Sequence, residues 1–202
     1  MSNTREQLQD RAEHYIRQGG FGSFSFRDLA KDLNIKSASV HYHFPSKSDL
    51  GTAVAERYNR RFEHALPGPT KSKLTTAELL RQYILMFYTE MMHSKQVCLC
   101  AMLSVERATL TADINAAVDA FYALNLNWLT DVFTRDGLPK PQAYKRSCQV
   151  LATLQGGLIG AWSQQNVDYF VQAVSGLYKD LFAKNLRLPK NDPDAIAATR
   201  EA

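Results

Sequence analysis

The 202-residue sequence lacks several features that would place it in common classes of protein. Its three cysteines are odd in number and too sparse for a disulfide framework. No apolar run approaches the length of about 18 residues that a membrane-spanning helix needs. The N-terminus, MSNTREQLQD, is polar where a signal peptide would be apolar. We therefore expect a globular protein of the cytoplasm that does not enter the membrane.

Sequence signatures of catalysis and of cofactor binding are missing as well. There is no glycine-rich phosphate loop, no nucleophile elbow and no pair of histidines or carboxylates at metal-ligand spacing. The sequence thus predicts neither an enzyme nor a cofactor or metal site. Strand-like alternation and internal repeats are lacking too, and this favours an all-α fold.

Apolar residues recur at helical spacing along most of the chain, of which 45% is hydrophobic. Besides three short helices near the N-terminus, the spacing predicts helices over residues 4–18, 76–92, 97–107, 112–135, 142–164 and 168–186. The tail after Pro189 is polar or alanine-rich. The run Pro67-Gly68-Pro69 breaks any helix, and we expect a domain of residues 1–65 and a larger one of residues 66–202.

The most informative local pattern lies between residues 24 and 49. Ser25 is followed three residues later by Asp28, which predicts a capping box at the start of a helix. Asn34 stands where this helix ends, and Asn tolerates the left-handed conformation of a tight exit. After Pro45, Ser46 and Asp49 predict a second capping box that begins a third helix.

Between these two, residues 38–44 are expected to form a helix with Ser37 as its N-cap. Val40 and Phe44 are four residues apart and share its apolar side. The other side presents Ser39, Tyr42 and His43. Three short helices within about thirty residues are typical of a helix-turn-helix unit, so the sequence predicts a DNA-binding protein.

Several motifs in this region occur in a familiar order: Gly20-Phe21, Leu29-Ala30, Tyr42-His43-Phe44 and Ser46-Lys47-Ser48-Asp49. In these motifs the chain resembles the TetR family of bacterial transcriptional regulators. It departs from the family at Asn34, where Gly is usual, and at His41, where Tyr is frequent and often touches DNA. The resemblance implies an N-terminal DNA-binding domain and a C-terminal helical domain for ligand binding and dimerisation.

Geometry and resemblance together suggest the DNA contacts. Arg27 can reach a guanine edge with its two-pronged guanidinium, although it could also be a solvated surface charge. Tyr42 and His43 could equally be packed within the fold. Lys47 can hold a phosphate at the start of its helix. The expected set is Ser25, Arg27, Lys36, Ser37, Ser39, His41, Tyr42, His43 and Lys47.

For the larger domain, the resemblance implies a two-fold dimer formed by the last two helices, with Leu154, Gly156, Gly157, Gly160, Phe170, Val174 and Leu177 at its interface. The apolar faces of these two helices could instead be packed within the core of a single chain. The resemblance also implies an effector cavity, lined by Tyr83, Phe87, Met91, Met102, Phe121, Trp128 and Trp162. Such aromatic and methionine side chains could also be ordinary core residues.

The segment Cys98-Leu99-Cys100 resembles the corresponding segment in a branch of the family that contains electrophile-responsive repressors. Cys98 or Cys100 could therefore be a reactive redox sensor, or both could be inert buried thiols. The overall expectation is a repressor that binds a pseudo-palindromic operator as a homodimer and is released by a small apolar or aromatic effector. A helical adaptor without DNA activity is the alternative, which a gel-shift experiment would distinguish.

Overall fold

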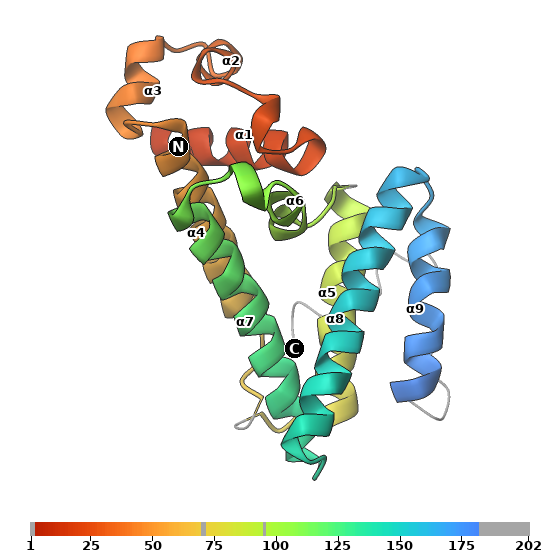
Figure 1. Cartoon of the computed structure of the whole chain (residues 1–202). Helices are drawn as coiled ribbons and strands as arrows, with labels where there is room; N and C mark the ends of the chain where they lie inside the picture. Colours follow the sequence, from red (N-terminus) through yellow and green to blue (C-terminus); the bar gives the residue numbers. More distant parts are fainter. Residues whose placement is uncertain (1–2, 70–71, 95, 182–202) are drawn as a thin grey trace. The chain divides into compact units, whose positions relative to one another are not determined.

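The structure, a computed structural model, describes residues 3–69, 72–94 and 96–181 (Figure 1). These residues form nine α-helices and two short 3₁₀ helices, and among them no β-strand. The helices are α1 (Thr4–Gly19), η1 (Phe21–Ser23), α2 (Phe26–Asp32), α3 (Ser37–His43), α4 (Lys47–Ala65), α5 (Thr76–Ser94), α6 (Leu99–Val105), η2 (Arg107–Thr109), α7 (Ala112–Arg135), α8 (Lys140–Ser163) and α9 (Val167–Leu181). The predicted all-α fold is confirmed. No described helix is long and apolar enough to cross a membrane.

The long helices lie close to their predicted positions, and α7 has the predicted bounds. The segment predicted over 97–107 is shorter, because α6 ends at Val105 and a separate 3₁₀ helix follows. The predicted continuation of the last helix to residue 186 and the tail after Pro189 lie outside the described residues.

The described helices form two compact units. The first contains α1 to α4, α6 and α7 as far as Asn127, and the second contains α5, the rest of α7, α8 and α9. This grouping differs from the expected division at residue 65. The reason is that Leu99 and Ile114 lie in the same apolar core as Leu8 and Val54 of the N-terminal helices.

Reciprocal caps begin three of the four N-terminal helices. The pairs are Asn3 with Glu6 at α1, Ser25 with Asp28 at α2, and Ser46 with Asp49 at α4. The last two were predicted from the sequence. The third helix of the motif is different, because α3 begins at Ser37 and its N-cap, Lys36, makes no side-chain capping bond. The expectation that Ser37 is an N-cap was therefore wrong.

The turns that end α1 and α2 use left-handed backbone. Asn34 has φ 52°, as predicted, and Gly20 has φ 86°. At Gly20 an added Cβ would also lie 2.1 Å from a carboxylate oxygen of Glu106, so the Glu106 side chain would have to move. That oxygen, Oε1, accepts a 2.7 Å hydrogen bond from the backbone N–H of Phe21. The residue that follows α6 is thereby tied to the turn after α1.

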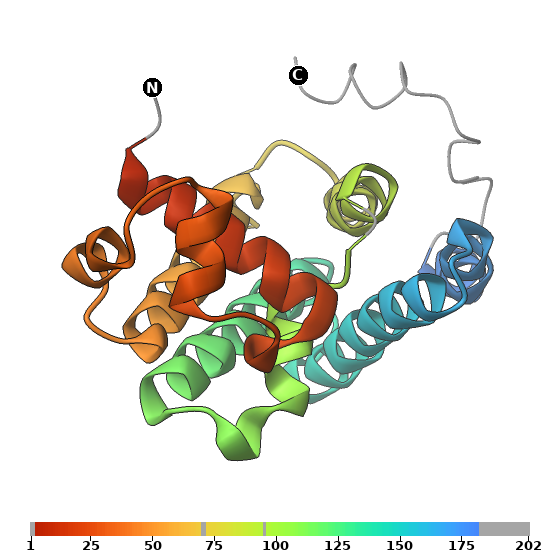
Figure 2. The same cartoon turned by 90° about the horizontal axis from the view of Figure 1, so that it is seen from above.

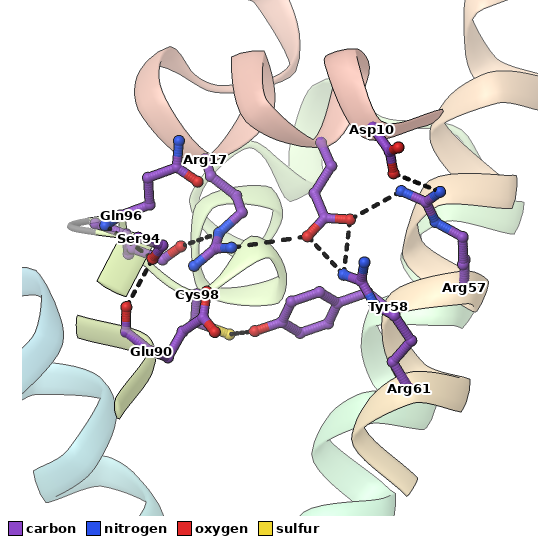
Figure 3. A network of polar contacts seen from close by, with 11 residues as sticks. Asp10, Arg17, Arg57, Tyr58, Arg61, Glu90, Ser94, Gln96 and Cys98 are labelled. Carbon is purple, nitrogen blue, oxygen red and sulfur yellow. Dashed lines mark hydrogen bonds and ion pairs between the residues drawn. The ribbon is translucent and has the colours of Figure 1, made fainter. Parts of the chain in front are cut away.

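One buried carboxylate, Glu13, joins α1 to α4. Its oxygens accept hydrogen bonds of 2.6 and 2.7 Å from Arg61, and Arg57 donates another of 3.1 Å. Arg17, one helical turn along α1, lies 3.7 Å from the same carboxylate. Figure 3 shows the three arginines converging from two helices. Glu13 is 7% exposed, and a charge at that depth is stable only when it is paired.

The beginning of α6 is also tied to the N-terminal helices (Figure 3). Arg17, itself buried, donates from Nε to the carbonyl oxygen of Val97 at 2.8 Å. The Tyr58 hydroxyl on α4 donates to the Cys98 sulfur at 3.6 Å. Together with the bond from Phe21 to Glu106, these contacts hold both ends of α6 within the first unit.

The second unit is packed mainly through apolar and aromatic side chains. α8 and α9 lie side by side (Figures 1 and 2). They approach closely at Gly157, where an added Cβ would be 3.0 Å from the ring of Phe170. In the same unit the fully buried Tyr83 stacks on Trp128 with ring centroids 5.1 Å apart. Complementary side-chain shape thus contributes to how these helices fit.

Candidate nucleic-acid interface

α3 turns one face into the first unit and leaves the opposite face exposed. Val40 and Phe44 are 0% and 1% exposed and anchor the helix to the core. Tyr42 is 85% exposed, and His41 is exposed as well. A large aromatic side chain that is almost fully exposed contributes little to the core, so its place on this helix indicates a binding surface.

A surface hollow of about 360 Å³ lies beside this helix. Its lining comes from α1, from the turn after α2 and from α3, and consists of Thr4, Ile35, Ala38, Ser39, Tyr42 and His43. The structure therefore brings together three of the expected DNA contacts, Ser39, Tyr42 and His43. It adds Thr4, which the sequence did not suggest because that residue belongs to a helix far away in the chain.

The other expected contacts at the start of α2 and α3 are open to solvent. Arg27, Lys36 and Ser37 are all exposed. His41 packs edge-on against the ring of Phe26, with centroids 4.9 Å apart, so its imidazole is oriented by α2. These side chains are accessible to a ligand as large as a DNA duplex.

Ser25 and Lys47 are already engaged within the protein. The Ser25 hydroxyl donates to the carboxylate of Asp28 at 2.6 Å as part of the α2 cap. The Lys47 ammonium donates to the carbonyl of Phe24 and lies over the rings of Phe21 and Phe24. Partial burial there lowers the pKa of Lys47. A phosphate contact by Lys47 therefore requires its ammonium to leave the Phe24 carbonyl.

Arg5, near the start of α1, was missed by the sequence reasoning. Its Nη1 donates to the carbonyl oxygen of His43 at 2.8 Å. Its guanidinium carbon lies 4.3 Å from the centroid of the Phe44 ring. The partners are 38 residues apart along the chain, and no local pattern points from one to the other.

The seven residues expected to line an effector cavity divide between the two units. Met102 and Phe121 belong to the first, where Met102 packs against the main apolar core and Phe121 is fully buried beside Tyr58. The second contains Tyr83, Phe87, Met91, Trp128 and Trp162. Met102 and Phe121 thus pack within the first unit. The effector site itself stays a prediction.

Most of the residues expected at the dimer interface are buried inside a single chain. Leu154, Phe170 and Val174 are each 0% exposed, and Gly157 and Leu177 are also buried. Gly160 faces Tyr169 of the same chain, and only Gly156 among the seven is exposed. Side chains buried within one chain cannot form the surface that a second chain meets, and at Gly157 with Phe170 and at Gly160 with Tyr169 these residues show contacts between α8 and α9. The dimer interface itself stays a prediction.

Cys98 and Cys100 are buried, at 2% and 0% exposure. Burial raises the pKa of the Cys100 thiol well above its ordinary value, which disfavours the reactive thiolate. Cys148 on α8 is partly exposed. Within the described residues, no group of three or more His, Cys, Asp or Glu side chains could hold a metal ion.

Two family models match the chain. The model described as bacterial regulatory proteins of the tetR family matches residues 8–54, which lie in α1 to α4. The model described as the C-terminal domain of LmrA/YxaF-like transcriptional regulators matches residues 76–175. An uncharacterized HTH-type transcriptional regulator in the lacX 3' region of Lactococcus lactis is 22% identical over 169 residues, which are 79% of this chain and 83% of that protein.

Solved structures have the same fold. A TetR transcriptional regulator from Legionella pneumophila is 27% identical, with a TM-score of 0.83 over 89% of this chain and 98% of its own. A TetR-family regulator from Agrobacterium tumefaciens is 26% identical, with a TM-score of 0.80 over 88% and 96%. The chain belongs to the TetR family of bacterial transcriptional regulators. It is therefore a DNA-binding transcriptional regulator that uses its helix-turn-helix unit, and not an enzyme.

Proposed function

We propose that this protein is a ligand-responsive repressor that binds a pseudo-palindromic operator as a homodimer. The observation that supports this most directly is the exposed face of α3, where Tyr42 stands beside Ser39 and His43 at the surface hollow. One helix reads only one half-site, so a two-fold dimer supplies the second. Because bacterial DNA lies in the cytoplasm, we place the working protein there.

Within each half-site we assign different tasks to the exposed side chains. Arg27 forms the bidentate contact with a guanine edge that its fork-shaped guanidinium favours. Ser39, Tyr42 and His41 reach bases or phosphates from the outward side of α3. Lys36 and Ser37 lie where α3 begins, the end that enters the major groove in this kind of unit.

The surface we assign to the dimer is the outward side of α8 and α9. Tyr144, Ile159 and Tyr169 are exposed there at 52%, 43% and 46%. Gly156 is exposed on α8, with no atom within 4 Å of an added Cβ, so another helix could approach closely. Large exposed apolar side chains on one pair of helices support an interface with a second chain.

A charge in this surface tests the dimer. Ile159→Glu should convert a dimer in solution to a monomer and weaken operator binding, because a carboxylate would be buried without a partner. Ala123→Glu is the matched control, since Ala123 is exposed on α7 and belongs to the other unit. Light scattering gives the mass and footprinting the protected DNA. A wild-type monomer that protects a single half-site would contradict the dimer.

The hydrogen bonds that connect α6 to α1 and to the turn after it support a way for ligand binding to change the position of the DNA-binding helices. Val97 directly follows Gln96, which ends the first segment of the second unit, and accepts the hydrogen bond from Arg17 on α1. A displacement of the chain before Val97 therefore acts on α1 through this bond and through the Glu106 tie to Phe21. For release, the effector must bind the form with low DNA affinity more tightly than the other form.

We favour reversible binding of a small apolar or aromatic effector over chemical modification of Cys98 or Cys100. Both thiols are buried, and the raised pKa of Cys100 keeps that thiol protonated. The five aromatic or methionine side chains expected at the cavity in the second unit supply apolar surface, whereas the electrophile alternative depends on one short run.

The decisive experiment is a gel shift on duplex DNA from the region upstream of the protein's own gene. Specific binding should occur, should weaken with added salt because phosphates are contacted, and should be lost when a suitable aromatic compound is added and recovered on its dilution. Binding that shows no preference for any upstream sequence would contradict the proposed repressor.

A further inference from the structure

α3 is poorly secured by its own sequence compared with the helices around it. It has seven residues, which is far too short to be stable alone, and it has no side-chain cap at its N-terminus. The neighbouring α1, α2 and α4 each begin with a reciprocal capping box. The orientation of α3 must therefore depend on contacts with other helices.

Two of those contacts are the buried anchors Val40 and Phe44. Both lie on the inward side, and His41 adds a ring contact with Phe26 of α2, but none of these side chains binds the free carbonyls at the C-terminal end of the helix. A contact with those carbonyls would fix that end as well. Arg5 makes such a contact from α1.

The Arg5 side chain makes two favourable interactions at the C-terminal end of α3. Its Nη1 donates to the His43 carbonyl, one of the last carbonyls of α3 that lacks a partner within the helix. A cation near a helix C-terminus also complements the helix dipole. The guanidinium lies over the Phe44 ring, so the same side chain holds the buried anchor and the end of the helix together.

We infer that Arg5 is a positioning residue for DNA recognition. It acts through His43 and Phe44, fixing the angle at which α3 presents Tyr42 and its neighbours, and it does not touch the DNA itself. This inference rests on the proposed use of α3 in reading the operator. The competing role for an exposed arginine on this side of the molecule is a direct phosphate contact.

Hydrogen exchange of the free protein tests the positioning without DNA. Arg5→Ala should raise the exchange rates of the α3 amides, including the Phe44 amide that bonds to Val40, while those of α4 stay unchanged. The matched control is Arg60→Ala, which removes the same charge from an exposed pair with Glu56 on α4. Equal α3 exchange in the two variants would overturn the inference, whatever the protein does with DNA.

Binding measurements then separate positioning from phosphate contact. Arg5→Ala should weaken specific operator binding about tenfold, the effect of losing roughly one charge-assisted hydrogen bond. Its non-specific binding and the salt dependence of its affinity should match those of Arg60→Ala. A phosphate contact would instead lower the salt slope by about 0.9 and weaken both kinds of binding alike, which would overturn the inference.

Arg5→Lys completes the test, because lysine keeps a cation for the Phe44 ring and one donor for the His43 carbonyl. It should recover most of the operator affinity and most of the α3 protection together. Recovery of affinity without recovery of protection would mean that charge alone matters and would contradict positioning. If wild-type protein bound no operator while Arg5→Ala still loosened α3, the proposed function would fail and the structural role of Arg5 would stand.

Discussion

The two units are stabilised by different kinds of contact. In the first, an apolar core that includes Leu8 and Val54 is supplemented by charged contacts between helices, since Glu13 joins α1 to α4 and Arg17 joins α1 to the start of α6. In the second, aromatic stacking and close helix approach predominate, as at Tyr83 and at Gly157. Where buried charged groups link two helices, losing one group leaves its partners buried without it, which is costly. A unit held by shape is changed mainly by altering side-chain volume.

The largest expected effect concerns Glu13. Glu13→Ala leaves Arg17 and Arg57 in a largely buried place without their shared carboxylate, and we expect a loss of about 3 kcal/mol in the free energy of unfolding. Glu56→Ala, which removes an exposed carboxylate 3.8 Å from Arg60, should change it by less than about 0.5 kcal/mol. Urea unfolding of both variants measures the difference. Equal stabilities would show that these charged contacts add nothing measurable to the stability that the apolar core gives the first unit.

A smaller effect separates two adjacent glycines of α8. Gly157→Ala places a Cβ 3.0 Å from the buried Phe170 ring and should destabilise the protein by about 1 kcal/mol. Gly156→Ala meets no atom of its own chain within 4 Å and, in the monomeric Ile159→Glu background, should stabilise the helix by roughly 0.5–1 kcal/mol. Thermal unfolding of the two variants measures whether each substitution lowers or raises the stability of the protein. Stabilisation by both would mean that the packing of α8 on α9 is looser than the contact at Gly157 indicates.

The smallest effect is expected for the cysteines. Because burial raises the pKa of Cys100, its thiolate fraction is low at neutral pH and rises only as the pH is increased. A maleimide should therefore modify the partly exposed Cys148 before Cys98 and Cys100, as peptide mass spectrometry would detect. Cys98→Ser should leave the effector response intact. Complete loss of an electrophile response in that variant, with DNA binding preserved, would favour the redox alternative.

Local chemistry made much of the first unit predictable. The capping boxes at Ser25 and Ser46 and the left-handed turn at Asn34 depend on residues within a few positions of each other, and all three were found as predicted. The start of α3 was misplaced by one residue. Serine is a favoured N-cap residue, so Ser37 was expected to precede the helix, whereas it is the first residue of the helix.

Contacts between distant segments were not predictable. The bond from Arg5 to His43 and that from Phe21 to Glu106 join residues 38 and 85 positions apart, and no periodicity encodes them. An apolar stripe in the sequence predicts that a helix face is buried. It does not show whether a helix of the same chain or a second chain covers that face. For that reason Leu154 and Phe170 were expected at a dimer interface, although both are fully buried within one chain.

The central claim is that the exposed face of α2 and α3 reads the operator. Competition binding of Arg27→Ala against operator variants tests it most directly, with Arg60→Ala as the control for charge. Arg27→Ala should cost about 1–3 kcal/mol of specific binding and relax the preference at one base pair in each half-site. Affinity and base preference equal to those of Arg60→Ala, in a folded protein, would contradict the claim.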